Sequence, residues 1–279
     1  MYIMGVLNKS LLEEDMNWKE FQEQSRLTEK EYRNVSNKLA HVGSFAYWPK
    51  PESNSTPLGR YKSAAEDLIV DSEHFSAHLE PCLNKSVILL GLNFGVPAAI
   101  KAKINAVHHD SAKILEIWQS MNYMSNQYGK KYGQKSLNHR NLQMRHDYIH
   151  GAYMTDFFKY PLDDTKFVAT GLPTSTAAEL FKEYKGASRR ELVSHNADGL
   201  VHELVDILEV PRHFVIVSMH TSLKPKYIQK AIKERFAHAG HQVEIIDSMP
   251  HYQARKTKEE FKEAYKSVNT QIAAYVSAW

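Results

Sequence analysis

The chain has 279 residues, enough for one large domain or two small ones, and either arrangement can bury a large hydrophobic core. Its 35 Lys and Arg residues against 32 Asp and Glu residues leave a net charge of +3, which permits a nucleic-acid surface without requiring one. The single cysteine, Cys82, excludes a disulfide framework, a four-cysteine zinc site and a cysteine-held iron–sulfur cluster. Because the sequence shows neither an apolar run of about 20 residues nor a basic leader, we expect a cytoplasmic protein with no membrane partner.

The first 80 residues divide into a helical part and a loop. Residues 11–39 place apolar side chains at helical spacing, and Thr28 with Glu31 predicts a capping box at a helix start. Residues 41–61 combine glycine and proline with aromatic residues, which is typical of a loop. We expect residues 1–80 to be an N-terminal segment packed on the core, and residues 81–279 to form the main domain.

From residue 86 onward the chain alternates between apolar runs and amphipathic stretches. The runs predict buried strands, and the stretches predict the helices between them. This alternation indicates an α/β fold with a mostly parallel, four-stranded central sheet. The predicted strands cover residues 86–92, 149–158, 214–218 and 242–246, and the predicted helices cover residues 100–124, 196–209, 226–239 and 257–276.

Polar residues follow each predicted strand, at the edge where ligands bind in parallel sheets. Gly91 and Gly95 flank Asn93 after the first strand, but the spacing is neither a dinucleotide fingerprint nor a phosphate-binding loop, and taken alone it is better explained by an ordinary strand–helix turn. Asp156 ends the second strand among apolar residues, where a carboxylate needs a partner. Lys159 is one such partner in a purely structural interpretation.

The last strand leads into His251, followed by a basic stretch. A histidine there suits the stabilisation of an oxyanion, and the basic residues suit phosphates. The alternative is a solvated basic turn with no ligand.

The order of these motifs resembles the uracil-DNA glycosylase superfamily. Residues 91–95 match the family's turn after the first strand, residues 153–156 its base-reading segment, and residues 250–253 its histidine loop. The resemblance covers roughly residues 86–276 and implies a three-layer α/β/α fold. An alternative alignment places the histidine loop at His220. In the preferred alignment, with His251 in that loop, His220 has a secondary role and lines the wall of the pocket.

The resemblance also implies a role for each matched residue. Asn93 would position the attacking water and His251 would stabilise the leaving base, so these two are the predicted catalytic residues. The other implied contacts are to the base (Asp156, Phe94, Gly91, Gly95 and His220) and to the DNA strand (Tyr252, Arg255, Lys256 and Lys258). Asn93, Asp156 and His251 are predicted to converge on one cleft.

Three positions depart from the family pattern. Phe94 and Tyr252 stand where proline is usual, and Asp156 stands where the base-reading residue is usually asparagine. An asparagine amide both donates and accepts hydrogen bonds, so it pairs with O4 and N3–H of uracil, whereas an ionised aspartate only accepts. The substitution therefore argues against simple uracil specificity.

The sequence thus predicts a monomeric, DNA-binding glycosylase that flips a damaged or deaminated base and hydrolyses its N-glycosidic bond. No cofactor and no metal are expected. Two alternatives remain. One is a non-catalytic member of the same fold that binds nucleic acid or nucleotides, and the other is an unrelated α/β enzyme that acts on a small nucleotide or sugar phosphate.

Overall fold

The structure is a computed structural model that describes residues 20–46, 75–93, 110–126, 148–169, 171–172, 177–246, 249–250 and 257–279. These residues form an α/β fold built on a five-stranded mixed sheet. The elements are, in chain order, α2 (Glu29–Lys38), β1 (Ser44–Phe45), η2 (Phe75–Leu79), β2 (Asn84–Asn93), α6 (Ser111–Asn126), β3 (Ala152–Phe158), α8 (Ala177–Glu183), α9 (Gly186–Val201), η5 (His202–Ile207), β4 (His213–Ser218), η6 (Thr221–Leu223), α10 (Lys226–His238), β5 (Gln242–Ile246) and α11 (Lys258–Val276).

The strands of the sheet lie in the order β1-β3-β2-β4-β5. The strands β3, β2, β4 and β5 run parallel to one another, as the sequence predicts. The short strand β1 pairs antiparallel with β3 and adds an edge strand to the sheet. The predicted four-stranded sheet is therefore corrected to five strands. The fifth consists of Ser44 and Phe45, which pair with Met154 and Tyr153 inside a stretch predicted to be a loop. Two residues are too few to show a strand periodicity, so only the pairing with β3 reveals β1.

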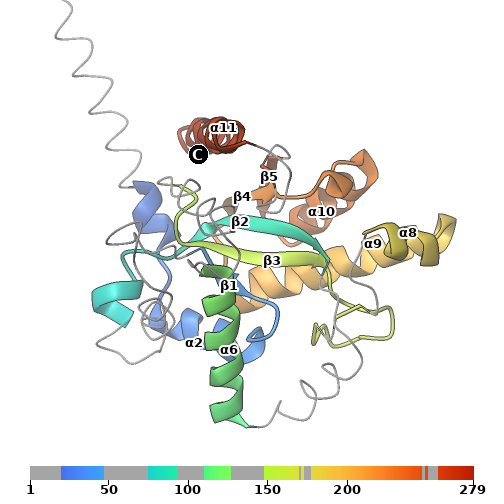
Figure 1. Ribbon diagram of the computed structural model, residues 1–279, viewed down its shortest axis with the longest axis horizontal. Helices are drawn as coiled ribbons and strands as arrows, with labels where there is room; N and C mark the ends of the chain where they lie inside the picture. The colour runs from blue at the N-terminus through green and yellow to red at the C-terminus, as the bar shows by residue number, and fades with distance from the viewer. Residues whose placement is uncertain are drawn as a thin grey trace, which may run out of the picture.

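Helices cover both faces of the sheet, with α11 on one side and α2, α6 and α9 on the other (Figure 1). The side chains of β2 serve both faces in alternation, because successive residues of a strand point to opposite sides. Ile88 and Leu90 join the hydrophobic cluster that includes α2, α9 and α10, whereas Val87 and Leu89 pack with α11. This double burial explains the unbroken apolar run from which β2 was predicted.

Most predicted elements agree with the structure to within a few residues. The strand β5 has the predicted bounds, and α11 begins directly after Thr257, which forms the predicted kind of cap. The helix predicted from residue 196 starts ten residues earlier, at Gly186, and continues into the π-helical turn η5. The first half of α9 is largely exposed, so it shows no apolar stripe. Of the helix predicted over 100–124, residues 100–109 lie outside the described part of the chain.

The described part of the N-terminal segment contributes to the same core as the rest of the chain. The Thr28 hydroxyl accepts a hydrogen bond from the Glu31 amide, and the Glu31 carboxylate accepts one from the Thr28 amide, which confirms the predicted capping box. Tyr32 of α2 accepts a hydrogen bond from Trp118 of α6 at 2.9 Å and stacks against Phe45 of β1. These aromatic residues belong to the hydrophobic cluster that also contains α9 and α10.

Candidate functional site at the carboxyl edge of the sheet

The carboxyl ends of β2 and β4 lie where the connections of the sheet reverse direction. From β2 the chain passes through α6 to β3 on one side, and from β4 it passes through α10 to β5 on the other side. In open α/β sheets, ligands bind in the crevice that such a reversal leaves beyond the strand ends. The polar residues that end or follow β2, β3 and β4 therefore define the candidate site.

Gly91 and Asp156 are paired neighbours across the parallel strands β2 and β3. The Asp156 side chain fills the space beside the glycine, because a Cβ atom on residue 91 would lie only 2.0 Å from Oδ1 of Asp156. Leu89 and Met154, two positions earlier on the same strands, pack in the cluster with α11. Because alternate residues of a strand share a face, Gly91 and Asp156 lie on the α11 face as well. The tertiary structure thus brings the strand-turn motif and the predicted base-reading residue into direct contact.

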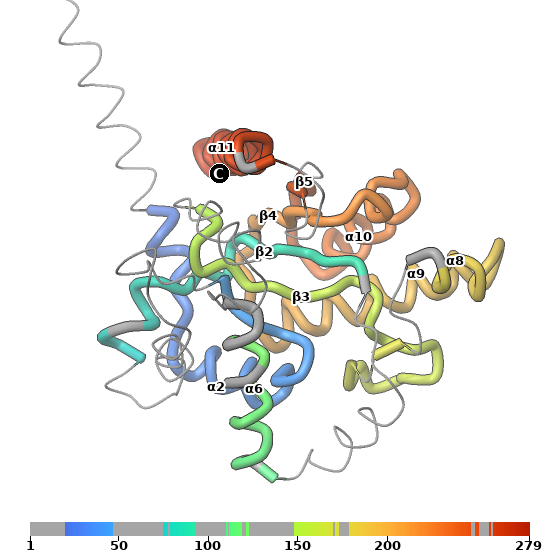
Figure 2. Tube along the Cα trace, viewed as in Figure 1, coloured from blue at the N-terminus to red at the C-terminus, as the bar shows by residue number. Residues whose placement is uncertain are grey.

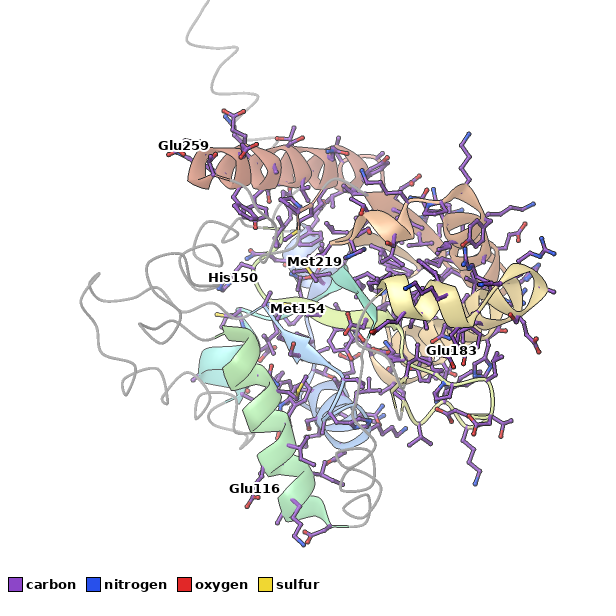
Figure 3. All side chains as sticks on the ribbon, turned by 45° about the vertical axis from the view of Figure 1, so that its right-hand side comes forward. Glu116, His150, Met154, Glu183, Met219 and Glu259 are labelled. Carbon is purple, nitrogen blue, oxygen red and sulfur yellow. The ribbon has the colours of Figure 1, made fainter. Side chains whose placement is uncertain are left out.

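Methionine side chains lie on the same face, close to the strand ends. Met154 of β3 and Met219, directly after β4, are buried in the layer between the sheet and α11 (Figure 3). The backbone amide of Met219 donates to the carbonyl of Leu90 at 2.9 Å, which extends the pairing of β2 and β4 to this edge. Asp156 therefore borders an apolar layer rather than a polar one.

This environment favours the protonated form of the Asp156 carboxyl group. The side chain is half-buried, and loss of solvent raises its pKa from 3.8 to about 6. The ammonium group of Lys159 opposes that rise, and the carboxylate of Glu203 adds to it. Near neutral pH the group therefore changes between a form that donates and accepts hydrogen bonds and a form that only accepts them.

A buried ion pair lies behind Asp156, on the opposite face of the sheet. Lys159, just after β3, pairs with Glu203 of η5, and both side chains are completely buried. The ammonium group also donates to the Thr155 hydroxyl and, at 2.7 Å, to the main-chain carbonyl of Asp156. Three acceptors thus match the three N–H donors of an ammonium group. The Asp156–Lys159 contact anticipated from the sequence is made through the backbone carbonyl of Asp156.

Two tyrosines complete the hydrogen bonding of Glu203. The hydroxyl groups of Tyr153 and Tyr160 donate to its two carboxylate oxygens at 2.9 and 2.8 Å. Burial, and next the nearby negative charge of Glu203, raise the pKa of both phenols well above its ordinary value, so both remain donors. We call Lys159, Glu203, Tyr153 and Tyr160 the Lys159 cluster.

Asn196 of α9 holds the chain that leaves β3. Its side-chain oxygen accepts hydrogen bonds from the amides of Lys159 and Tyr160, and its side-chain nitrogen donates to the carbonyls of Tyr160 and Leu192. Figure 2 shows this segment, in yellow-green, running from the end of β3 to the neighbourhood of α9. The position of the Lys159 cluster is therefore fixed from two elements at once.

His220 follows β4 at the same edge and presents a neutral imidazole. Its Nδ1 accepts a hydrogen bond from the Ser222 amide at 3.1 Å, and because an amide only donates, Nδ1 carries no proton. Partial burial lowers the pKa of His220, which also favours the neutral form. The remaining proton lies on Nε2, where it is a hydrogen-bond donor.

The other predicted site residues are described only in part. Phe94, Gly95, His251, Tyr252, Arg255 and Lys256 lie outside the described residues. For Asn93 and Lys258 the structure describes the backbone. Asn93 ends β2 in register with Phe158, at the same edge as Asp156, and Lys258 is the first residue of α11. The convergence of Asn93, Asp156 and His251 on one cleft stays a prediction.

The start of α11 is already capped by its own side chains. Thr257 and Glu260 form a reciprocal capping box, and Glu259 adds a second carboxylate to the first turn. These acids oppose the attraction of a helix N-terminus for phosphate. Any phosphate contact in this region must therefore come from the basic side chains rather than from the helix end.

An exposed basic segment, residues 224–227, follows His220 and was not singled out from the sequence. Lys224 and Lys226 are exposed, and Tyr227 beside them has 41 % of its surface exposed. No aspartate or glutamate occurs between residues 210 and 233, so the segment has no acidic neighbour along the chain. That absence is the signal in the sequence from which this segment could have been found.

The Lys159 cluster was also missed, although its members leave a trace in the sequence. Glu203 lies between Leu200 and Ile207 at helical spacing, on the same apolar face. A carboxylate on such a face must be buried and paired. The sequence signals that a partner exists, but only the fold identifies Lys159.

Within the described residues, no three His, Cys, Asp or Glu side chains are grouped so that they could hold a metal ion. Over the same part of the chain, no helix combines the length and the apolar character of a membrane span. A cavity of about 170 Å³, lined by Ser25, Cys82 and Asn84 among others, lies at the amino-terminal end of β2, away from Asp156. A comparison with protein-family models, curated proteins and solved structures finds no match to this chain.

Proposed function

We propose that this chain binds DNA as a monomer and hydrolyses the N-glycosidic bond of a base turned out of the stack, on a three-layer fold like that of uracil-DNA glycosylases. The contact between Gly91 and Asp156 at the carboxyl edge carries this proposal. Those residues belong to two separate motifs of the resemblance, and their contact lies beside the reversal of the sheet connections. A half-buried carboxyl group at such an edge suits the recognition of a base edge.

In the proposed reaction, water adds its hydroxyl group to C1′ of the sugar while the bond from C1′ to the base nitrogen breaks. The electron pair of that bond leaves with the base, which takes up the remaining proton. Asn93 positions the water, and a neutral imidazole stabilises the negative charge on the departing base. His251 holds this role by resemblance. His220 is the alternative, since its Nε2–H is a donor at the same edge.

The ionisation of Asp156 sets which base is accepted. A protonated carboxyl group donates to O4 and accepts from N3–H, as the uracil edge requires, whereas the ionised group selects bases that present donors such as an exocyclic amine. With a pKa of about 6, only about 1 % of the group is protonated at pH 8. Recognition of uracil is therefore strongest in acid and fades as the pH rises.

Residues 224–227 supply a contact surface for the nucleic-acid strand. Lys224 and Lys226 neutralise phosphates, and Tyr227 offers a ring on which an unpaired base stacks. The segment follows His220 after the short turn η6 and lies at the edge where the flipped base would enter. This placement favours a strand that is already unpaired near the site.

The activity is tested with single- and double-stranded oligonucleotides that carry uracil, hypoxanthine, xanthine or a mismatch. Abasic sites are measured between pH 5 and 8 for the wild type, Asp156→Asn and Asn93→Ala. We expect wild-type excision of uracil to fall above pH 6, Asp156→Asn to retain it at pH 8, and Asn93→Ala to lose it. No abasic product from any substrate rejects the glycosylase function, and turnover of free nucleosides alone favours the small-nucleotide enzyme.

Binding is tested separately, by fluorescence anisotropy at several salt concentrations. Replacing Lys224 and Lys226 by alanine should weaken binding and reduce the salt slope by about 1 for each lysine. The matched control removes Lys262 and Lys266, two exposed lysines of α11, and should leave the slope closer to that of the wild type. Equal slopes in the two double variants would show that residues 224–227 do not contact the strand.

A further inference from the structure

We propose that the buried Lys159–Glu203 pair is a positioning device for Asp156: Lys159 holds the end of β3 through a hydrogen bond to the Asp156 carbonyl, and the pair keeps one charge of each sign buried behind the Asp156 carboxyl group. This inference rests on the proposed function only where it concerns base choice. The electrostatic part concerns Lys159, Glu203 and Asp156, which all lie in the described part of the chain.

The geometry links the pair to Asp156 in two ways. Lys159 Nζ lies 2.7 Å from the main-chain carbonyl of Asp156, so its position fixes the backbone from which the carboxyl group projects. Its charge also acts on that carboxyl group across the end of the strand. Neither Lys159 nor Glu203 has any exposed side-chain surface, so solvent screens these charges far less than it would at the surface.

The two charges act on Asp156 in opposite directions. The ammonium group of Lys159 favours the ionised carboxylate, and the carboxylate of Glu203 disfavours it. Among the described residues, these are the charged groups that act on Asp156, and its paired neighbour on β2 is the uncharged Gly91. The balance between them, added to burial, places the change of ionisation close to neutral pH.

A buried ion pair is an unusual means of stabilising a fold. Transferring two charges out of water costs about as much as their attraction returns, so a hydrophobic pair of similar volume is often as stable. The hydroxyl groups of Tyr153 and Tyr160 donate to the two oxygens of the Glu203 carboxylate. The retained charges therefore have a use that apolar residues do not supply, and we assign that use to the control of Asp156.

The test is the titration of the Asp156 carboxyl carbon by NMR in the 279-residue chain. Glu203→Gln removes the repelling charge and should lower the pKa of Asp156. Lys159→Met combined with Glu203→Gln removes both charges and should raise it, because the lysine has the larger effect of the two. The matched control is Lys233→Met combined with Glu244→Gln, an exposed ion pair at 2.8 Å between α10 and β5, which should leave it unchanged.

The outcomes separate this inference from the proposed function. An Asp156 pKa that is the same in the wild type and both cluster variants overturns the inference, whatever the activity. If the variant that combines Lys159→Met with Glu203→Gln does not fold, the single variant Glu203→Gln decides. It keeps the side-chain volume of Glu203, and the pKa change expected for Asp156 is opposite in sign to that of the double variant. If the pKa moves as expected and the pH midpoint of uracil-oligonucleotide binding moves with it, base choice is controlled by the pair. A pKa that moves without any oligonucleotide binding overturns the proposed function and leaves the electrostatic inference standing.

Discussion

Asp156→Asn should stabilise the folded protein at neutral and alkaline pH. The folded-state pKa of Asp156 is raised from 3.8 to about 6, so the folded chain holds this proton more tightly than the unfolded chain does. Ionisation then costs stability. The cost is absent below pH 3.8, grows as the pH rises through about 6, and is constant above that. At about 1.4 kcal/mol per pKa unit, the full cost is about 3 kcal/mol.

Asparagine keeps the shape of the side chain and its donor and acceptor, but it does not ionise. We therefore expect the wild type and Asp156→Asn to have similar free energies of unfolding at pH 4, and the variant to be about 3 kcal/mol more stable at pH 8. Urea unfolding followed by tryptophan fluorescence at pH 4, 6 and 8 measures this difference. Asp163→Asn, at an exposed position after β3, is the matched control for loss of a negative charge. A stability difference that is constant with pH, or that grows toward acid, would refute the reasoning.

Four further substitutions test the packing around the site and the helix ends. Gly91→Ala should cost about 1–3 kcal/mol because its Cβ would lie 2.0 Å from Oδ1 of Asp156, and combining it with Asp156→Ala should restore most of that loss in a double-mutant cycle. Asn196→Ala should cost several kcal/mol in urea unfolding, since it removes the side-chain acceptor of the buried Lys159 and Tyr160 amides and each unsatisfied group costs about 1–3 kcal/mol. Thr28→Ala and Thr257→Ala should each cost about 1 kcal/mol by removing a capping box, whereas Thr270→Ala, inside α11, should cost less.

The strands β4 and β5 and the helices α10 and α11 could be predicted from the sequence almost to the residue. Their signals are local. The strand β4 is a continuous apolar run, and α11 starts at a capping residue that has its partner three positions later. Thr28 with Glu31 and Thr257 with Glu260 satisfy that spacing within a single turn, so the rest of the chain is not needed to recognise either cap.

Contacts between distant segments depend on the tertiary structure. That Gly91 faces Asp156 follows from the parallel register of β2 and β3, which no local pattern reveals. The same holds for Glu203, whose partner Lys159 comes from a different element. The residue type alone shows that a charged side chain needs a partner once that side chain is buried. Which charge it meets, and hence that the Asp156 carboxyl group ionises near neutral pH, depends on how the strands and helices pack, because desolvation and Coulomb interactions act across space rather than along the chain.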